Sequence, residues 1–247
     1  MVFFAHGSIG RRVVQFALDY DRSTVSGIVA LSGDDHVAGL VAENDLVPRI
    51  EFDAADPDET GNRIRSLNAN IAILAWWPRL LKPQYLHLGQ AVTLNLHPSL
   101  LPHGRGKDPN FWAIVEGSPF GVTIHHVDDE IDSGEIAFQR EIPYGWEDTG
   151  KTLYEKATKG IIELFCECYP RIIAFDIPRR VQDHSNGSFH KRSELDDRSL
   201  MTLDHKHTIR DILNLLRART FESHPACRFV DRNSTYEVRV SIRRVGD

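Results

Sequence analysis

Two apolar runs that end in polar residues, IAILAWWPR at 71–79 and VTLNLHPSLLPHGRG at 92–106, decide the fold class of this chain. Short continuous apolar runs of this kind are typical of strands that are buried on both faces of a parallel sheet. Ligands of open α/β sheets bind beyond the carboxyl ends of such strands. We therefore expect two central strands, with a functional site among the residues that follow them.

The residues before these runs alternate between short apolar stretches and amphipathic stretches. Short apolar stretches predict strands, whereas apolar residues three or four positions apart predict helices. We predict strands at 2–5, 25–31 and 47–50, and helices at 11–20, 36–44 and 58–68. This alternation predicts an α/β fold with a mostly parallel sheet and right-handed crossovers.

The pattern changes after residue 106. We predict strands at 121–127 and 136–142, and helices at 109–116, 149–173 and 208–218, the last capped by Thr208. Residues 182–198 are polar and predict a loop, and residues 227–230 and 235–245 predict a hairpin that turns at 231–234. The predicted organisation is a domain at 1–178 and a small C-terminal α+β subdomain at 179–247.

Composition and length limit the class of protein. The 247 residues are ample for a buried core, and the net charge of −6 gives no global attraction to nucleic acid or to an anionic membrane. The longest apolar runs are far shorter than the ~20 residues of a membrane span, and the opening MVFFAHGSIGRR lacks the layout of a signal peptide. We expect a cytoplasmic protein. Its three cysteines lack a disulfide-framework spacing.

Asn95 and His97 are the first candidate functional residues, because they end the predicted strand at 92–96. Residues two apart on a strand point to the same side, so an amide and an imidazole would converge beyond the sheet edge. The alternative is that His97 caps a turn while Asn95 satisfies loop backbone groups. The pair alone does not decide between these interpretations.

Two loops add further candidates. Gly104, Arg105 and Gly106 form a loop in which backbone can approach a ligand closely and a guanidinium is free for phosphate, although it lacks the lysine and hydroxyl of a P-loop. Residues 128–135 hold five carboxylates, so most must be solvated and one or two can be functional. Their spacing is not that of a calcium-binding EF-hand loop, and the twelve histidines show no zinc-binding spacing. We expect no metal site.

Three separated motifs together resemble the formyltransferase superfamily. They are NLHPSLLPHGRG at 95–106, GVTIHHVDDEIDSGEI at 121–136 and DTGKTLYEKA at 148–157. The resemblance implies a Rossmann-like formyltransferase core that uses N10-formyltetrahydrofolate as co-substrate. It also implies that Asn95, His97 and Asp132 form the catalytic triad. The division of roles between His97 and Asp132, either of which could handle the proton, stays open.

A narrower resemblance concerns the acceptor. RGKDPNFWAI at 105–114 and the segment from Ile209 to Ile242 are similar to the sugar N-formyltransferases. These act on nucleotide-linked amino-dideoxysugars of bacterial surface polysaccharide, which implies a dTDP-linked aminosugar and O-antigen synthesis. Glu130, where relatives often carry glycine, and the bulky pair Trp76-Trp77 depart from the pattern.

The resemblance also implies contacts with both substrates. The expected folate contacts are Trp77, Pro78, Arg79, Val127, Asp128, Asp129, Glu130, Ile131 and Asp132. The expected acceptor contacts are Ser8, Pro102, His103, Gly104, Arg105, Gly106, Asn110, Trp112, His190, Lys191 and Arg192. For Trp112, a place in the core is as good an interpretation as acceptor contact. For residues 190–192, a solvated basic turn is as good an interpretation as phosphate contact.

Two further expectations complete the prediction. His125 and His126 face opposite sides of a strand, which predicts structural roles. The C-terminal hairpin, with Tyr236 and Val238 among its alternating apolar residues, needs a partner surface, so we expect packing on its own domain or a homodimer. Alternative functions are formyl transfer to methionyl-tRNA or glycinamide ribonucleotide, and a folate- or nucleotide-binding protein without turnover.

Overall fold

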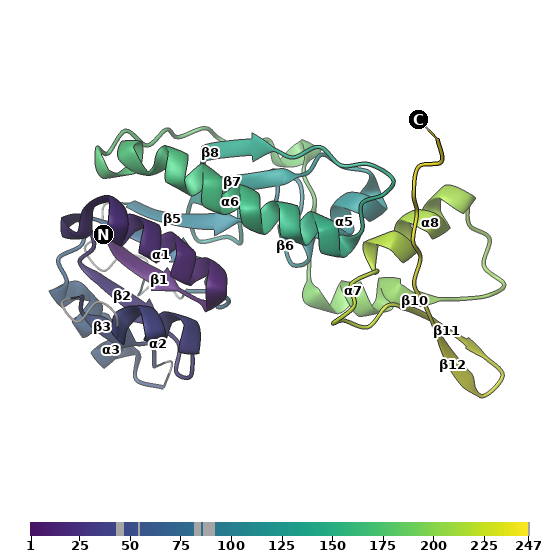
Figure 1. The fold of residues 1–247 in the computed structure, drawn as a ribbon, viewed down its shortest axis with the longest axis horizontal. Coiled ribbons are helices and arrows are strands. Elements are labelled where there is room, and N and C mark those ends of the chain that lie inside the picture. Colours follow the sequence, from purple (N-terminus) through teal and green to yellow (C-terminus); the bar gives the residue numbers. More distant parts are fainter. Residues whose placement is uncertain (43–46, 54, 82–84, 86–91, 247) are drawn as a thin grey trace.

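A seven-stranded sheet forms the centre of the molecule (Figure 1). The computed structural model describes residues 1–42, 47–53, 55–81, 85 and 92–246. The strands are β1 (Val2–Ala5), β2 (Gly27–Ala30), β3 (Arg49–Glu51), β4 (Ile71–Ala75), β5 (Val92–His97), β7 (Gly121–His126) and β8 (Ile136–Glu141). Their order is β3-β2-β1-β4-β5-β7-β8, parallel from β3 to β5, with β7 antiparallel to both neighbours. The predicted mostly parallel α/β sheet is confirmed.

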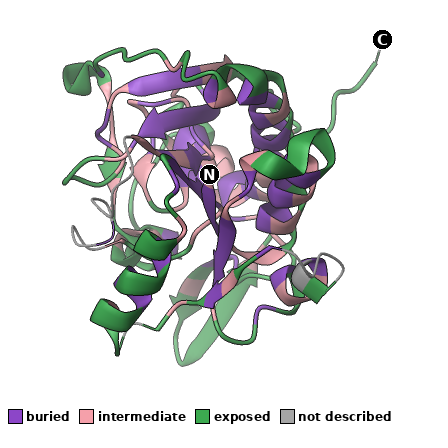
Figure 2. Cartoon of the chain, turned by 90° about the vertical axis from the view of Figure 1, so that its left-hand side faces the viewer, coloured by how far each residue is buried: buried purple, intermediate pink, exposed green. Residues whose placement is uncertain are grey.

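Helices cover both faces of this sheet. They are α1 (Gly7–Asp21), α2 (Asp35–Ala42), α3 (Pro57–Ser66), α5 (Pro109–Glu116) and α6 (Gly150–Ile173). Phe3 on β1 packs in the cluster that contains residues of α1 and α6, whereas its neighbour Phe4 packs in the cluster of α3. Because alternate residues of each central strand meet opposite helix layers, β1, β2 and β4 are buried throughout, and Figure 2 shows them between more exposed helices.

Strand pairing brings the carboxyl ends of β1, β4 and β5 to one edge of the sheet. Ala5 pairs with Ala75, and Leu74 pairs with Asn95. The antiparallel strand β7 then places His125 opposite Asn95 and Thr123 opposite His97. The side chains at this edge therefore come from segments that are far apart in the sequence.

The C-terminal elements lie at the end of the molecule opposite β3 and α3 (Figure 1). They are β9 (Phe189–His190), α7 (Arg192–Ser199), β10 (Leu200–Met201), α8 (Ile209–Ala218), β11 (Cys227–Asp231) and β12 (Ser234–Val238), with a short 3-10 turn at His184–Asn186 before β9. A second 3-10 turn, at Arg22–Thr24, connects α1 to β2. Helix α8 contacts α5 and α6. Thr208 caps α8 by accepting a hydrogen bond from the Asp211 N–H, as predicted. The division after residue 178 stays a prediction.

Two local predictions were wrong. Residues 182–198 contain β9 and most of α7 instead of being loop throughout. The sequence of α7 lacks an apolar periodicity, so its helix is recognisable only from the Glu194 carboxylate that accepts the Lys191 N–H at its start. The last strand ends at Val238 instead of Val245, because Val238 pairs with Cys227, the first residue of β11, and no partner backbone follows.

Within the described residues, no helix is both long and apolar enough to cross a membrane. The predicted helix at 36–44 is present as α2 up to Ala42, and its last two residues lie outside the described residues.

Candidate active site

Asn95, His97 and Asp132 converge at the carboxyl edge of the sheet. Asn95 and His97 end β5, and Asp132 lies on the loop between β7 and β8. The Asp132 carboxylate lies 3.6 Å from His97 Nδ1 and 3.4 Å from Asn95 Nδ2. The structure thus brings the three predicted triad residues together, and their catalytic roles remain a prediction.

The loop that carries Asp132 is shaped by the residues that follow it. Asp132 has a left-handed backbone conformation with φ of 53°, which aspartate tolerates better than most residues. A Cβ at Gly134 would lie 1.9 Å from the carbonyl oxygen of His126, so only glycine allows the loop to return this close to β7. Gln182 donates to the carbonyls of Asp132 and Gly134 at 3.0 and 2.7 Å. Ser133 donates to Asp128 Oδ1 at 2.6 Å, so both residues of the Ser-Gly pair after the aspartate shape this loop.

Backbone groups of the 104–106 loop hold both His97 and Asp132. The Gly104 carbonyl lies 3.1 Å from His97 Nε2, and the Gly106 N–H donates to Asp132 Oδ2 at 2.9 Å. Because a carbonyl can only accept, His97 carries a proton on Nε2. Its Nδ1 therefore faces Asp132 and, in the neutral ring, carries the free lone pair.

His125 is a fourth member of the cluster, and sequence reasoning missed it. Its Nδ1 lies 2.8 Å from the His126 carbonyl, which assigns the proton to Nδ1. Its Nε2 accepts from Asn95 Nδ2 at 3.1 Å and lies 3.5 Å from Asp132 Oδ1. The pairing of β7 with β5 was the signal that could have found it. His126 points away and bonds the Pro178 carbonyl, so the predicted opposite orientation is confirmed.

Burial and charge set opposite protonation states for the two central residues. Burial alone would raise the pKa of Asp132, but His97 and His125, when their rings are protonated at low pH, and the Gly106 N–H lower it well below its usual range. Burial lowers the pKa of His97, and the nearby Asp132 charge only partly opposes this effect. At neutral pH the site therefore holds a carboxylate beside a neutral imidazole, which can accept a proton.

Two of the expected folate contacts, Trp77 and Val127, pack against one apolar cluster on a face of the sheet. Trp77 is half-buried, with its ring edge-on to Phe4 at 5.5 Å and to Phe52 at 5.3 Å. Val127 packs against the same cluster, which brings the two predicted folate segments to one wall. Pro78, Arg79 and residues 128–131 are exposed. The adjacent Trp76 packs on the other side, against the Tyr154 ring at 6.0 Å.

The expected acceptor contacts differ in how far they are exposed to solvent. Ser8 is exposed in the first turn of α1, and Lys191 and Arg192 are exposed at the start of α7. Arg105 lies over the Phe189 ring at 6.0 Å. Trp112 is only 6% exposed and packs in the core. Pro102 and His103 are partly buried in the loop before Gly104.

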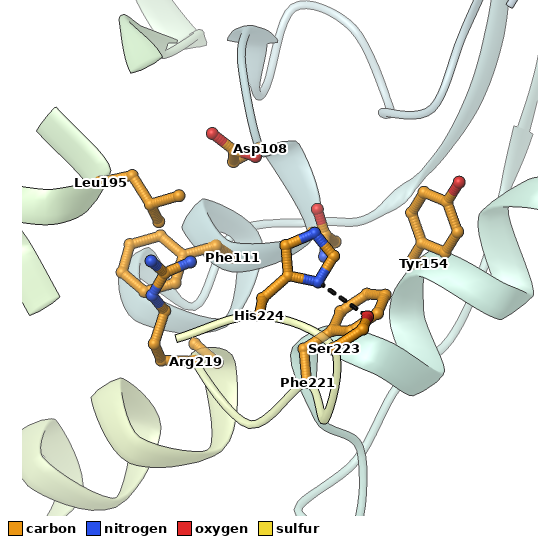
Figure 3. Close-up of a pocket in the computed structure, with 10 residues that line it drawn as sticks. Asp108, Phe111, Tyr154, Leu195, Arg219, Phe221, Ser223 and His224 are labelled. Atoms are coloured by element: carbon orange, nitrogen blue, oxygen red, sulfur yellow. Dashed lines mark hydrogen bonds between the residues drawn. The ribbon is translucent and has the colours of Figure 1, made fainter. Parts of the chain in front are cut away.

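A pocket of about 420 Å³ begins at Asp108, two residues after the 104–106 loop (Figure 3). It is lined by Asp108, Asn110, Phe111, Tyr154, Leu195, Ala218, Arg219, Phe221, Ser223 and His224. Of these, only Asn110 was predicted, because the others come mostly from α6, α7, α8 and the turn after α8. Figure 3 shows the Arg219 guanidinium beside the Phe111 ring and His224 between them and Tyr154.

Arg219 is the least satisfied polar residue of this pocket. Its side chain is only 10% exposed, its Nη2 lies 3.3 Å from Asp196, and its buried Nε has no hydrogen-bond partner among the described residues. Burial raises the pKa of the neighbouring Asp108, although Arg192 and Arg219 oppose this shift. A partly desolvated cation next to aromatic rings suits an anionic ligand that also carries a planar ring. Among the residues that the structure describes, no group of three or more His, Cys, Asp and Glu side chains could hold a metal ion.

Known families and structures resemble this chain over most of its length. Residues 12–168 match a family model described as formyl transferase, and residues 194–244 match one described as the N-formyltransferase dimerization C-terminal domain. A sugar N-formyltransferase from a Shewanella species superposes with a TM-score of 0.83 at 20% identity, covering 99% of this chain and 98% of that chain.

Two further structures were solved with ligands. An N-formyltransferase from Helicobacter canadensis, in complex with folinic acid and dTDP-3-aminofucose, has a TM-score of 0.72 at 19% identity, covering 91% of this chain and 82% of that chain. A formyltransferase from Anoxybacillus kamchatkensis, in complex with UDP-4,6-dideoxy-4-formamido-L-AltNAc and tetrahydrofolate, is 31% identical over 69% of this chain and 88% of that chain, with a TM-score of 0.55.

Proposed function

Because the chain belongs to the formyl transferase family, we propose that it transfers a formyl group from N10-formyltetrahydrofolate to the amino group of a nucleotide-linked aminosugar. The observation that carries this proposal is the cluster of Asn95, His97 and Asp132, with a neutral imidazole beside a carboxylate at the sheet edge. Sugar N-formyltransferases share the fold over nearly the whole chain, which supports a sugar amine as acceptor.

His97 is the proposed proton acceptor. The attacking amine must lose a proton as its nitrogen bonds to the formyl carbon, and the lone pair of neutral His97 Nδ1 is available for it. The adjacent Asp132 charge stabilises the imidazolium that results, since the two groups lie 3.6 Å apart. The imidazolium then gives this proton to folate N10 as the bond between N10 and the formyl carbon breaks, which releases tetrahydrofolate and restores neutral His97. Asp132 thereby acts through His97 and stays ionised itself.

Asn95 is the proposed donor to the formyl oxygen. As the amine attacks, that oxygen gains negative charge, and one well-placed N–H is worth about 3 kcal/mol in comparable sites. One Asn95 N–H bonds His125 at 3.1 Å, whereas the other reaches Asp132 only at 3.4 Å. The second contact is long for a hydrogen bond, so this N–H is the one that a formyl oxygen can capture.

The wall of Trp77 and Val127 fits the folate. Both side chains are half-buried in one apolar cluster, and the buried Trp77 Nε1 has no hydrogen-bond partner among the described residues, which leaves a donor for a polar ring edge. Bound there, N10-formyltetrahydrofolate supplies the activated formyl group. The exposed 128–131 loop, which follows Val127 and precedes Asp132, would cover it.

The pocket around Arg219 is the proposed site of the acceptor's nucleotide. It begins at Asp108, two residues after Gly106, so it continues from the catalytic cluster. Phe111, Tyr154 and Phe221 offer aromatic faces for a base, and the buried Arg219 offers an unsatisfied donor for the phosphates. The dTDP-linked amino-dideoxysugar expected from sequence, and a place in O-antigen (lipopolysaccharide) synthesis, are part of this proposal.

We also propose that the chain forms a homodimer in the cytoplasm. Its C-terminal region carries large apolar residues that are unusually exposed for their type: Leu200 at 60%, Ile209 at 78% and Val230 at 53%. Tyr236 stacks on Phe229 and is still 47% exposed. The match to a C-terminal model described as a dimerization domain supports a second copy as the partner.

The test is a turnover assay with N10-formyltetrahydrofolate and a panel of thymidine-, uridine- and guanosine-linked 3-amino and 4-amino deoxysugars. Product is measured as the N-formyl sugar by mass spectrometry. Turnover of at least one aminosugar supports the proposal. Formylation of methionyl-tRNA or glycinamide ribonucleotide alone would redirect the acceptor, and folate binding without turnover of any amine would contradict an enzymatic function.

A further inference from the structure

The backbone loop that holds His97 and Asp132 is itself held from behind by a segment from much later in the chain. Strand β6 (Arg105–Gly106) pairs in parallel with β9 (Phe189–His190). The Arg105 N–H donates to the Ser188 carbonyl and the Lys107 N–H to the His190 carbonyl, both at 3.0 Å. The Gly104 N–H donates to Ser188 Oγ, also at 3.0 Å. One side of the loop thus faces the catalytic residues while its other side is fixed to 188–190.

The imidazole of His190 anchors β9. The ring stacks on Trp112 with centroids 3.6 Å apart and planes 7° apart. Its Nε2 lies 2.6 Å from Glu116 on α5, and its Nδ1 lies 2.9 Å from Glu194 on α7. Only 14% of the side chain is exposed. Both ring nitrogens and one face of the ring are therefore in contact with the protein.

These contacts leave β9 little freedom to slide along β6. A Cβ at Gly106 would lie 2.2 Å from the His190 carbonyl oxygen, so the two strands approach closely at this position. Gln182 begins the segment that leads into β9, residues 182–190, which we call the linker, and it donates to the carbonyls of Asp132 and Gly134. This linker therefore contacts the Asp132 backbone directly through Gln182, and it contacts the backbone of residues 105–107 through β9.

We propose that His190 is a positioning residue for formyl transfer, which acts by fixing β9 and thereby the Gly104 carbonyl and Gly106 N–H that orient His97 and Asp132. The sequence suggested His190 as a phosphate contact. With carboxylates on both ring nitrogens, a phosphate at this ring would be repelled by Glu116 and Glu194, and no ring nitrogen is free to bind it.

The expected effect falls on turnover. Displacements of about 1 Å in a catalytic group can lower rates by ~10²-fold even when the mutated residue lies away from the chemistry. We expect His190→Asn, which removes the stack on Trp112 and one carboxylate contact, to lower kcat by about 10- to 100-fold. KM for the aminosugar and for the folate should stay within about threefold, because His190 binds neither.

This inference rests on the proposed function, and the experiment separates the two. His190→Asn is compared with His184→Asn, an exposed histidine of the same linker, at a temperature where both are folded by circular dichroism. Glu116→Ala, which removes one partner of the ring at the surface, is a milder variant that should fold in any case. We expect an intermediate fall in kcat for Glu116→Ala and wild-type kcat for His184→Asn.

A second readout does not need activity. Amide hydrogen exchange at Gly106, followed by NMR, should become at least about tenfold faster in His190→Asn, while amides of β4 keep their protection. Unchanged kcat in His190→Asn, or a lower kcat with unchanged Gly106 exchange, would overturn the positioning role. Absence of formyl transfer in the wild-type protein would instead overturn the proposed function, and Gly106 exchange would still decide whether His190 holds the loop.

Discussion

Replacing Asp132 by asparagine should abolish most turnover while leaving the fold intact. The side chain lies 3.6 Å from His97 Nδ1 and accepts the Gly106 N–H at 2.9 Å. An amide oxygen can still accept from Gly106, so the loop geometry should survive. What disappears is the negative charge that stabilises protonated His97. Loss of acid–base assistance costs ~10²- to 10⁴-fold in rate, or about 2.7–5.4 kcal/mol at 1.36 kcal/mol per tenfold change.

The pH dependence gives this prediction a direction as well as a size. Burial lowers the pKa of His97, so the acid limb of kcat should lie below the usual histidine range of about 6.5. The Asp132 charge raises that pKa, so Asp132→Asn should move the acid limb to still lower pH. A shift to higher pH would refute this view of the pair.

Stability supplies an independent check. The pKa of Asp132 is lowered in the folded protein, so its carboxylate stabilises the fold above the unfolded pKa of about 3.9 and this contribution is lost as pH falls. The difference in unfolding free energy between wild type and Asp132→Asn should therefore stay nearly constant from pH 7 to about pH 5 and shrink as pH falls below about 4. The control is Asp176→Asn, an exposed carboxylate paired with Arg171. A folded Asp132→Asn protein with kcat within fivefold of wild type would refute the reasoning.

Four further predictions follow from single contacts. His125→Asn should lower kcat about tenfold with little change in KM, because Asn95 loses its 3.1 Å partner; unchanged kcat would exclude His125 from the cluster. Arg219→Ala should weaken nucleotide-sugar binding by about 10- to 100-fold in calorimetry and leave folate binding unchanged. The control Arg232→Ala, in the exposed hairpin turn, should leave both affinities unchanged. If Arg219→Ala binds the nucleotide sugar as tightly as wild type, the nucleotide lies elsewhere. Tyr236→Ser should shift the protein from dimer to monomer in light scattering, and a monomeric wild type would contradict the dimer. Gly134→Ala should lower the unfolding free energy by more than ~1 kcal/mol in urea titrations, since its Cβ would lie 1.9 Å from the His126 oxygen; a smaller loss would mean that the loop can move away.

Much of the fold was predictable because its strands and helices carry local patterns. The continuous apolar run at Ile71–Ala75 and the helical spacing of α6 identify those elements without any tertiary information. The pattern fails at α7, whose residues are nearly all polar and whose helix depends on Glu194 at its start. It also fails at the end of β12, which is set by the length of its partner β11.

The candidate site also contains residues that local sequence patterns predict and residues that they do not. Asn95 and His97 were predictable as a pair, because two residues at the end of one strand share a side. Asp132 followed from motif resemblance. His125 was interpreted as structural because its importance depends on the register between β7 and β5, which no local pattern reveals. The pocket around Arg219 was not predictable from the sequence, because its lining residues come mostly from four helices and a turn that are far apart in the chain.

The sequence by itself determined the α/β class, the central strands and the polar residues at their ends, because hydrophobic periodicity and chain direction are local properties. Only the tertiary structure decided which backbone groups hold those residues and what state they adopt. The proton on His97 Nε2 follows from the Gly104 carbonyl, the charge on Asp132 follows from His97, His125 and Gly106, and the loop that connects them is fixed by His190. These effects arise from burial and from contacts between distant segments, which exist only once the chain has folded.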